Sequence, residues 1–309
     1  MKCRLSAAIG FAGLLTCFAA LSNLGEAQSA AKHQQAVLVT GASTGIGRKI
    51  TERLAADGYF VYAGARKEAD LSSLGAIKNV QPVRLDVTST ADIDAAVAMI
   101  TKAGRGLYGL VNNAGVATVG RLVETKWEEF DLVMAVNVYG PYRVTKAFAP
   151  LIVAQKGRIT TIGSISGILA DPDLAAYSMS KHAMEAFTDS LAKQMAPLGV
   201  QVSVVEPGSY ETRITQNAGS RMGADPRLTD LAGQKDPEEV AVATEKALFE
   251  PNPKRRYMVV PDKVEAELTI KQQIVQLVQL NEGQPYTYDR EALVKMLDAT
   301  LAQARPRTQ

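Results

Sequence analysis

Ser164, Tyr177 and Lys181 are residue types suited to acid–base chemistry, and they fall within one short stretch of the chain. Tyr177 and Lys181 are four residues apart, so on a helix their side chains lie on one face, one turn from each other. A cation about 4 Å from a phenol lowers its pKa from about 10 by roughly three units, toward the range of a general acid–base. A short strand-to-helix loop would place the Ser164 hydroxyl beside the phenol.

The Tyr-x-x-x-Lys spacing also occurs at Tyr142 and Lys146, so the spacing alone does not identify a site. For either pair, the alternative is two surface residues on an amphipathic helix. Context separates the pairs, because only Tyr177 closely follows an apolar, serine-bearing stretch, residues 158–164. We therefore predict the site at Tyr177, provided that the rest of the chain supplies its other parts.

The composition excludes several classes of site. Of the 309 residues, 47% are hydrophobic and 21% are charged, as in an ordinary globular protein with a full core. A net charge of +2 gives no electrostatic reason to expect nucleic-acid binding. The two cysteines, Cys3 and Cys17, both precede residue 20, and there are only two histidines. We predict no disulfide or thiolate chemistry in the body of the protein, and no metal site.

Residues 1–31 have the pattern of a targeting segment. Lys2 and Arg4 precede an apolar stretch that ends in small residues, as in a secretory signal peptide or a membrane anchor. This predicts an exported protein, or one associated with a membrane through its N-terminus. The alternative is a mis-called start codon, with a cytoplasmic protein that begins near Lys32.

From residue 35, short β-rich runs alternate with longer helical runs. This alternation predicts an α/β fold over residues 35–262, a single doubly wound (Rossmann) domain with helices on both faces of a mostly parallel seven-stranded sheet. The expected strands are residues 36–40, 59–63, 80–85, 107–111, 157–163, 199–205 and 256–260. Two further helical runs, about 263–280 and 290–304, predict a C-terminal helical extension over residues 263–309.

The first expected strand leads into a glycine-rich turn with the spacing Gly-x-x-x-Gly-x-Gly. A strand, such a turn and a helix N-terminus together form an anion site, because backbone N–H groups point outward and glycines allow close approach. We predict that a nucleotide phosphate binds here, with a plain tight turn as the alternative. The expected binding residues are Gly41, Ser43, Thr44, Gly45, Ile46 and Gly47.

Two charged residues follow the next two strands. Arg66 follows the second strand, where dinucleotide folds that prefer NAD carry an acidic residue. Since an arginine forms a bidentate pair with a 2′-phosphate, Arg66 favours NADP, unless it is only a solvated loop charge. Asp86, followed by Val87, ends the third strand. It either accepts from an adenine amino group or caps the helix that begins near Ser89.

Polar residues also follow later strands. Asn-Asn-Ala-Gly at 112–115 forms a turn at a strand end, where ligands bind in open α/β sheets. Asn137 lies in an apolar run and is either a structural hydrogen bonder or part of a proton path. Pro207-Gly208 ends the sixth strand, and Thr212 follows. Residues 209–235 are polar, glycine-rich and weakly periodic, which predicts a mobile lid.

Taken together and in this order, these motifs resemble the short-chain dehydrogenase/reductase family over about residues 35–262. TGASTGIG at 40–47 is similar to the family's cofactor-binding turn, and Asn-Asn-Ala-Gly to the segment beside the cofactor. Gly-Ala-Arg at 64–66 resembles the NADP-preferring branch. VEPGSYET at 205–212 and the extra C-terminal helices resemble its hydroxysteroid and retinol dehydrogenase members.

The resemblance implies hydride transfer between NADP(H) and a small-molecule substrate that carries a ketone or a secondary alcohol. It also implies that this substrate is steroid-like, retinoid-like or otherwise apolar. Tyr177 exchanges the proton, Lys181 lowers the pKa of the phenol and binds the ribose, Ser164 holds the substrate oxygen, and Asn137 helps to hold a water. It also implies a homodimer or homotetramer. The further cofactor contacts that it implies are Arg66, Asp86, Val87, Asn113, Ala114, Gly115, Tyr177, Lys181, Pro207, Gly208 and Thr212.

Two other functions occur on related folds. An NADP(H)-sensing regulator tends to lose the tyrosine or the lysine, and this chain keeps both. A nucleotide-sugar epimerase or dehydratase favours Gly-x-x-Gly-x-x-Gly after the first strand, and the spacing of Gly41, Gly45 and Gly47 differs from it. Both features favour the dehydrogenase.

Overall fold

The computed structural model describes residues 35–223 and 233–304. The expected targeting segment, residues 1–31, lies outside the described residues, as does the middle of the expected lid, residues 224–232. The chain divides after Pro261 into two compact units.

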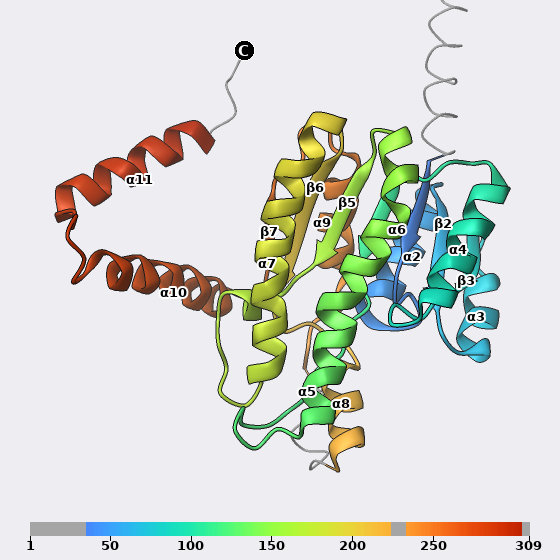
Figure 1. The fold of residues 1–309 in the computed structure, drawn as a ribbon, viewed down its shortest axis with the longest axis horizontal. Coiled ribbons are helices and arrows are strands. Elements are labelled where there is room, and N and C mark those ends of the chain that lie inside the picture. Colours follow the sequence, from blue (N-terminus) through green and yellow to red (C-terminus); the bar gives the residue numbers. More distant parts are fainter. Residues whose placement is uncertain (1–34, 224–232, 305–309) are drawn as a thin grey trace, which may run out of the picture. The chain divides into compact units, whose positions relative to one another are not determined.

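The first unit contains a seven-stranded sheet in which all neighbouring strands are parallel, in the order β3-β2-β1-β4-β5-β6-β7 (Figure 1). The doubly wound α/β fold predicted from the sequence is therefore confirmed. The strands are β1 Ala36–Val39, β2 Phe60–Ala65, β3 Val80–Arg84, β4 Gly109–Asn112, β5 Arg158–Ile162, β6 Gln201–Pro207 and β7 Arg256–Val259.

Helices cover both faces of this sheet, which explains why its central strands are apolar throughout. Val37 and Val39 pack into one core and Leu38 into the other, and all three are fully buried. The first core lies under α2 (Gly45–Ala56), α3 (Glu68–Gly75) and α9 (Glu238–Phe249). The second lies under α4 (Thr90–Ala103), α6 (Gly140–Ala154) and α7 (Ala175–Met195).

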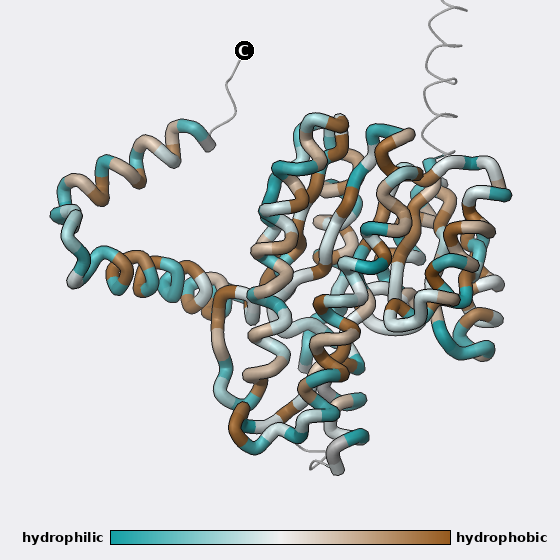
Figure 2. Tube along the Cα trace, in the orientation of Figure 1, coloured by the Kyte–Doolittle hydropathy of each residue, from teal (hydrophilic) through white to brown (hydrophobic). Residues whose placement is uncertain are grey.

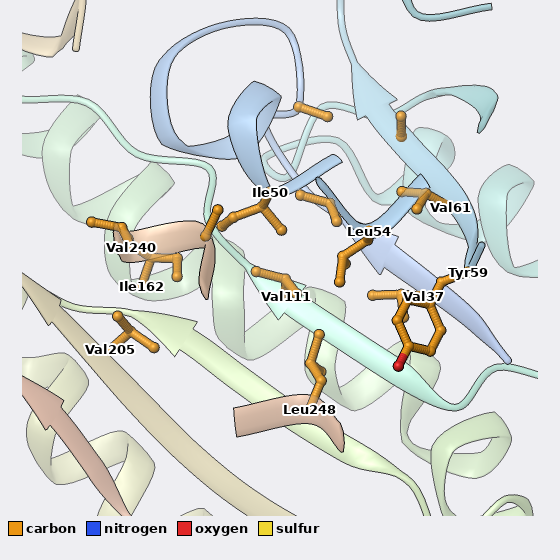
Figure 3. Packing of buried hydrophobic residues seen from close by; sticks show 14 of the residues in the cluster. Val37, Ile50, Leu54, Tyr59, Val61, Val111, Ile162, Val205, Val240 and Leu248 are labelled. Carbon is orange, nitrogen blue, oxygen red and sulfur yellow. The ribbon is translucent and has the colours of Figure 1, made fainter. Parts of the chain in front are cut away.

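Figure 3 shows the first core, where side chains from two helices meet the sheet. Ile50 and Leu54 of α2 and Val240 and Leu248 of α9 are all fully buried. Burying one such aliphatic side chain contributes roughly 1.5–3 kcal/mol. This packing fixes α2, and therefore the glycine-rich turn at its start, against the sheet.

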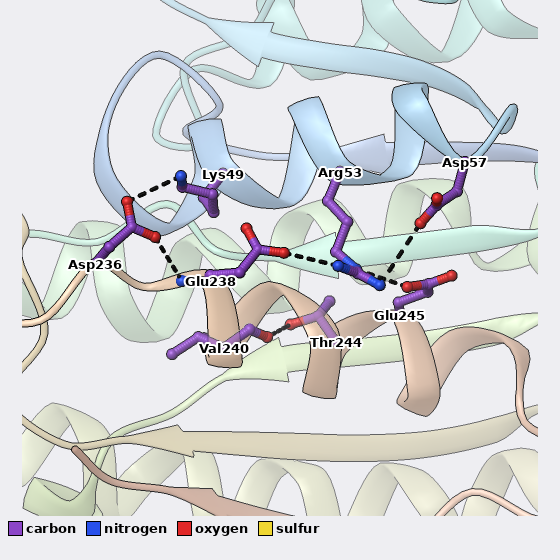
Figure 4. Close-up of polar contacts among 8 residues, drawn as sticks. All are labelled: Lys49, Arg53, Asp57, Asp236, Glu238, Val240, Thr244 and Glu245. Carbon is purple, nitrogen blue, oxygen red and sulfur yellow. Dashed lines mark hydrogen bonds and ion pairs between the residues drawn. The ribbon is translucent and has the colours of Figure 1, made fainter.

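Ion pairs reinforce the contact between α2 and α9 (Figure 4). Arg53 lies 2.7 Å from both Glu238 and Glu245, and 3.8 Å from Asp57. We call these four residues the Arg53 cluster. Lys49, one turn earlier on α2, lies 2.9 Å from Asp236. These contacts tie the helix that carries the glycine-rich turn to a segment far along the chain.

The second unit consists of α10 (Lys263–Asn281) and α11 (Arg290–Ala304), the predicted C-terminal helical region. Asp262 caps α10, because its carboxylate accepts a hydrogen bond from Glu265 N at 3.0 Å. Figure 2 shows apolar residues along α10, and Leu268, Ile274 and Leu277 are among its exposed side chains. Among the described residues, none of the helices combines the length and apolarity that crossing a bilayer requires.

Candidate active site

The predicted site residues lie at one edge of the sheet, at the carboxyl ends of its strands. Parallel strands end at the same edge, and the strand order turns around between β1 and β4, where doubly wound folds bind their ligands. The residues that follow β1 to β6 at this edge are, in order, Gly41–Gly47, Arg66, Asp86, Asn113–Gly115, Ser164 and Gly208.

The glycine-rich turn is held tightly against the segment after β4. Gly41 has a φ of +65°, and a Cβ there would lie 2.8 Å from Ala114 Cα. A Cβ on Gly47 would lie 2.2 Å from Asn113 Nδ2. That amide nitrogen donates to the carbonyl oxygens of Thr40 (2.8 Å) and Gly41 (3.1 Å). Asn113, predicted as a cofactor contact, therefore has a clear structural role in shaping the turn.

Helix α2 starts at Gly45, and its N-terminus has the donors that an anion requires. The N-cap residue Thr44 makes no side-chain capping hydrogen bond, and the first N–H that bonds back to the turn is Arg48 N, at 3.3 Å from Thr44 O. The N–H groups before it have no intrahelical partner. Thr212 is brought to this turn, since a Cβ on Gly45 would lie 3.4 Å from Thr212 Cβ.

Arg66 and Asp86 face each other after β2 and β3. Arg66 Nη1 lies 3.6 Å from Asp86 Oδ2, and the arginine side chain is 61% exposed. Burial raises the pKa of Asp86, but hydrogen bonds from Thr88 and the charge of Arg66 outweigh it, so the pKa lies below its ordinary value. Arg66 is thus a solvent-exposed residue paired with Asp86 across the ends of two strands, and its contact with a 2′-phosphate stays a prediction.

The interpretation of Asp86 as a helix cap is wrong. Helix α4 is capped by Ser89, whose hydroxyl accepts from Asp92 N at 3.2 Å, whereas Asp86 accepts from Thr88 N at 2.8 Å. The side chain of Val87 is buried, and a Cβ on Gly140 would lie 2.7 Å from its Cγ2. Asp86 therefore closes a turn at the sheet edge, where its predicted contact with adenine remains a prediction.

Asn137 lies on a π-helical turn, Ala135–Tyr139, between α5 (Trp127–Met134) and α6. Such turns insert an extra residue into a helix and are frequent at functional sites. The buried amide accepts from Val116 N (2.9 Å) and donates to Val116 O (2.8 Å) and Ser180 Oγ (2.9 Å). It therefore links the segment after β4 to α7, which is the structural hydrogen-bonding role; the proton path stays a prediction.

Tyr177 and Lys181 lie on the same face of α7, as their spacing predicts. Lys181 Nζ stands 5.4 Å from the centroid of the Tyr177 ring, and it donates to Ile162 O at 2.8 Å. The Ser164 hydroxyl lies beside the Tyr177 phenol and donates a hydrogen bond to Pro207 O at 3.5 Å. The structure thus brings together the ends of β5 and β6 and the first turns of α7.

The second Tyr-x-x-x-Lys pair has a different environment. The Tyr142 side chain is 55% exposed, and Lys146 Nζ lies 6.0 Å from the centroid of its ring. This is the surface pair that the alternative interpretation describes. The two copies of the motif therefore differ in exposure: Tyr142 lies at the surface, whereas the Tyr177 pair lies at the sheet edge, as the sequence around each copy indicates.

The acid–base state of the site differs from the expectation. Burial raises the pKa of Tyr177 to about 12, and the hydrogen bond with Ser164 lowers it only in part. Burial also lowers the pKa of Lys181 to about 8, against the opposing effect of Glu185. The Lys181 ammonium faces the ring and the carbonyl of Ile162, so in this structure it does not produce the predicted lowering of the phenol pKa.

The sequence interpretation missed a group of buried charges behind Lys181. Glu206, near the end of β6, is 2% exposed, and its carboxyl group lies near that of Glu185 on α7. Arg256 of β7 contacts both, and also Asp189. We call these four residues the Arg256 cluster. One feature of the sequence could have indicated this cluster. The stretch 202–206 has valine or serine at its first four positions and ends in a glutamate, which is unusual in a buried strand.

The base of the predicted lid is closed by contacts between its two ends. Glu211 N donates to Lys235 O at 2.9 Å, and the Tyr210 hydroxyl donates to Glu239 Oε2 at 2.6 Å. Helix α8 (Ile214–Met222) lies in the first half of this segment, and Arg221 on it donates to Ala117 O at 2.7 Å. The described part of the segment is therefore ordered against the core; its mobility stays a prediction.

Comparisons with known proteins agree with this arrangement. A family model described as short chain dehydrogenase matches residues 35–223. The mitochondrial D-beta-hydroxybutyrate dehydrogenase of Rattus norvegicus is 37% identical over 193 residues, 59% of this chain and 56% of that protein. Retinol dehydrogenase 5 of Mus musculus is 37% identical over 205 residues, 64% of each chain. The chain therefore spans between half and two thirds of the length of these curated relatives.

Solved structures are similar over most of this chain. A short chain dehydrogenase/reductase from Burkholderia phymatum in complex with NAD has a TM-score of 0.71 and 25% identity, covering 82% of this chain and 98% of that one. A short chain dehydrogenase from Burkholderia cenocepacia in complex with NADP has a TM-score of 0.66 and 26% identity, covering 81% and 98%. The family model, the relatives and the fold agree, and the chain belongs to the short-chain dehydrogenase family.

Proposed function

We propose that this protein is an oxidoreductase that transfers a hydride between NADP(H) and a ketone or secondary alcohol, with Tyr177 as the general acid–base. The observation that carries the proposal is the convergence of Ser164, Tyr177 and Lys181 at the sheet edge that holds the glycine-rich turn. The two animal relatives are named for alcohols, hydroxybutyrate and retinol, which supports a hydroxyl or carbonyl substrate. An apolar substrate, of the retinoid or steroid kind, is part of the proposal.

The residues at the start of α2 fit a dinucleotide. Its first N–H groups have no intrahelical partner, and a side chain at Gly47 would collide with the Asn113 amide, so the backbone itself forms the surface there. When bound, the nicotinamide supplies the hydride or accepts it. The similar structures hold NAD in one case and NADP in the other, so the preference for NADP depends on Arg66.

Each residue of the site has a role that follows from its contacts. The Ser164 hydroxyl, which lies beside the phenol, would hold the substrate oxygen there. Tyr177 would give its proton to a ketone oxygen or take one from an alcohol. Lys181 would bind the ribose and supply positive charge near the phenol, and Asn137 would hold the second turn of α7 in place through Ser180.

The pKa of the phenol favours one direction at neutral pH. With a pKa of about 12, Tyr177 is protonated at pH 7 and is ready to donate to a carbonyl oxygen. Alcohol oxidation needs the phenolate, so its rate is expected to rise with pH. We therefore propose that ketone reduction is the faster direction near neutrality.

Substitution of Tyr177 by Phe tests the acid–base assignment, and the second tyrosine motif provides the matched control. Tyr177→Phe removes only the hydroxyl and should lower kcat for ketone reduction by about 10²–10⁴-fold, with the Kd for NADPH unchanged. Tyr142→Phe should leave both values as they are. Turnover retained in Tyr177→Phe would remove the assignment. Tight NADPH binding without turnover of any ketone or alcohol in a broad panel would favour the regulator instead.

Substitution of Arg66 by Ala tests the cofactor preference. A charge-assisted pair contributes about 1.5–3 kcal/mol, so Arg66→Ala should weaken NADPH binding by about 10–100-fold and leave NADH binding unchanged. Arg105, an exposed arginine that precedes β4 at the opposite edge of the sheet, is the control. Equal losses for both cofactors would contradict the role of Arg66.

We also propose that the protein assembles as a homodimer or homotetramer, as the family resemblance implies. The predicted membrane association depends on residues 1–31, which lie outside the described residues. Size-exclusion chromatography with light scattering measures the assembly directly.

A further inference from the structure

The carboxyl groups of Glu185 and Glu206 meet behind Lys181. Glu185 lies one helical turn after Lys181 on α7, and Glu206 reaches the same place from β6, where its side chain is 3% exposed. Both Glu185 Oε1 and Glu206 Oε1 are buried, and no hydrogen-bond donor of the described residues reaches either atom. An ionised carboxylate oxygen can only accept a hydrogen bond, so a proton on one of the two groups would supply the missing donor.

One arginine lies close to both carboxyl groups of this pair. Arg256 Nε lies 3.1 Å from Glu185 Oε2 and 3.5 Å from Glu206 Oε1, while its Nη2 lies 2.8 Å from Asp189 Oδ2. Arg255 and Lys193 act on Asp189 from the outer side. Glu185 and Glu206 thus share one nitrogen of a guanidinium group that also pairs with Asp189, and this favours one ionised and one neutral carboxyl group in the pair.

Two glycines make room for the Glu185 carboxyl group. A Cβ on Gly163 would lie 3.3 Å from Glu185 Oε1, and one on Gly167 would lie 3.2 Å from the same atom. Gly163 follows Ile162, whose carbonyl oxygen accepts from Lys181 Nζ at 2.8 Å. The acid pair and the ammonium therefore share the carboxyl end of β5, with no larger side chain between them at these two positions.

The direction of each pKa agrees with this geometry. Burial raises the pKa of Glu206 to about 8 and also raises that of Glu185, so the pair keeps one proton at neutral pH. Burial lowers the pKa of Lys181 to about 8, and the negative charge of Glu185 opposes that effect. The charge that supports the ammonium thus comes from the next turn of its own helix.

We propose that Glu185 and Glu206 share one proton, and that the single negative charge left on Glu185 keeps Lys181 protonated. Glu185 is then a positioning residue for the acid–base chemistry, acting through Lys181, while Glu206 holds the shared proton. This inference rests on the proposed function for its role in catalysis. The charge relation between Glu185 and Lys181 does not depend on turnover, so the two are tested separately.

The direct test measures the ionisation of Lys181 by NMR of protein labelled with ¹³Cε-lysine, with Lys181→Met used to assign the signal. Loss of the nearby charge in Glu185→Gln should lower the pKa of Lys181 by about one unit. Glu206→Gln keeps the charge on Glu185 and should leave the pKa of Lys181 unchanged or raise it. Glu245→Gln, in the Arg53 cluster, is the distant control.

The kinetic test compares the same variants in ketone reduction with NADPH. If Lys181 must be protonated, the alkaline limb of kcat/KM should move to lower pH by about one unit in Glu185→Gln, and Glu185→Asp should restore most of the shift. A purely structural role would lower kcat/KM at every pH without moving the limb. If the protein turns over no substrate, the proposed function fails, and the NMR titration still decides the charge relation.

Equal shifts of the Lys181 pKa in Glu185→Gln and Glu206→Gln, or no shift in either, would overturn the inference. Wild-type protein labelled with ¹³Cδ-glutamate gives a measurement that needs no folded variant of Glu185. One carboxyl group of the pair should still be protonated at pH 7. Two fully ionised carboxylates at pH 6 would also overturn it.

Discussion

Two arginines in this molecule each meet three acidic side chains, and the two clusters behave differently. The Arg53 cluster joins α2 to α9, and the Arg256 cluster joins β6 and β7 to α7. The shortest contacts are nearly the same, 2.7 Å for Arg53 and 2.8 Å for Arg256. Composition and distance therefore do not distinguish them.

Burial of the acids is the difference. In the Arg53 cluster the side chains of Glu238 and Glu245 are 49% and 20% exposed, and water can solvate all three carboxylates. In the Arg256 cluster, the carboxyl group of Glu206 is nearly inaccessible and shares its arginine with Glu185. Burial and the neighbouring charge of Glu185 both raise the pKa of Glu206, so we expect Glu206 to keep a proton. The Arg53 cluster holds two helices together, whereas in the Arg256 cluster we infer that one carboxyl group keeps a proton.

The largest expected effect comes from removing each arginine in turn. Arg256→Met leaves buried acids without their cation and should lower the free energy of unfolding by about 2 kcal/mol, below the value for a fully buried pair because Arg256 is partly exposed. Arg53→Met should cost only about 0.5–1 kcal/mol. Urea unfolding at pH 7 measures both, and equal losses would show that burial does not separate the clusters.

A smaller effect is expected in the pH dependence of stability. The pKa of Glu206 is raised in the folded state, so between about pH 5 and 8 the native protein holds a proton that the unfolded chain has released. Stability should therefore fall as pH rises through this range, by on the order of 1 kcal/mol per pH unit. Glu206→Gln should remove this slope, whereas Glu245→Gln should keep it. Thermal or urea unfolding at pH 5, 6, 7 and 8 gives the comparison.

The smallest expected effect is that of salt. Raising the NaCl concentration from 0.1 to 0.5 M shortens the screening length, so the stability lost in Arg53→Met should shrink by a few tenths of a kcal/mol. The loss in Arg256→Met should change less, because the side chains of Glu185 and Glu206 are only 15% and 3% exposed and so are largely shielded from ions. The same urea titrations at two salt concentrations measure this. If salt changed the stability lost in Arg256→Met more than the stability lost in Arg53→Met, the Arg256 cluster would be the more solvent-exposed of the two.

Local features of the chain were predicted well. Each of the seven strands lies close to its predicted position, and the inner ones, such as β1 and β4, were recognisable because a strand buried on both faces is apolar throughout. Tyr177 and Lys181 lie on one face of α7, because their spacing sets that relation in any helix. The contrast between Tyr177 and Tyr142 was also visible, since the flanking strand marks one of them.

Other features depend on contacts that the sequence does not show. Ser89 and Asp86 are both residue types that cap helices. In the structure Ser89 caps α4, whereas the Asp86 carboxylate accepts from Thr88 N within the preceding turn. The raised pKa of Tyr177 depends on how deeply the phenol is buried and on where the Lys181 ammonium points. Spacing predicts that two groups are near each other, but it does not give the burial that opposes their attraction.

The sequence by itself determined the order of strands and helices, the glycine-rich turn and the shared face of Tyr177 and Lys181, since each depends on residues close along the chain. Only the tertiary structure decided that Glu185, Glu206 and Arg256 meet, because they come from a helix and two strands far apart in sequence. The physical reason is the same in each case. Periodicity is a local property, whereas the desolvation that sets a pKa depends on everything packed around the group.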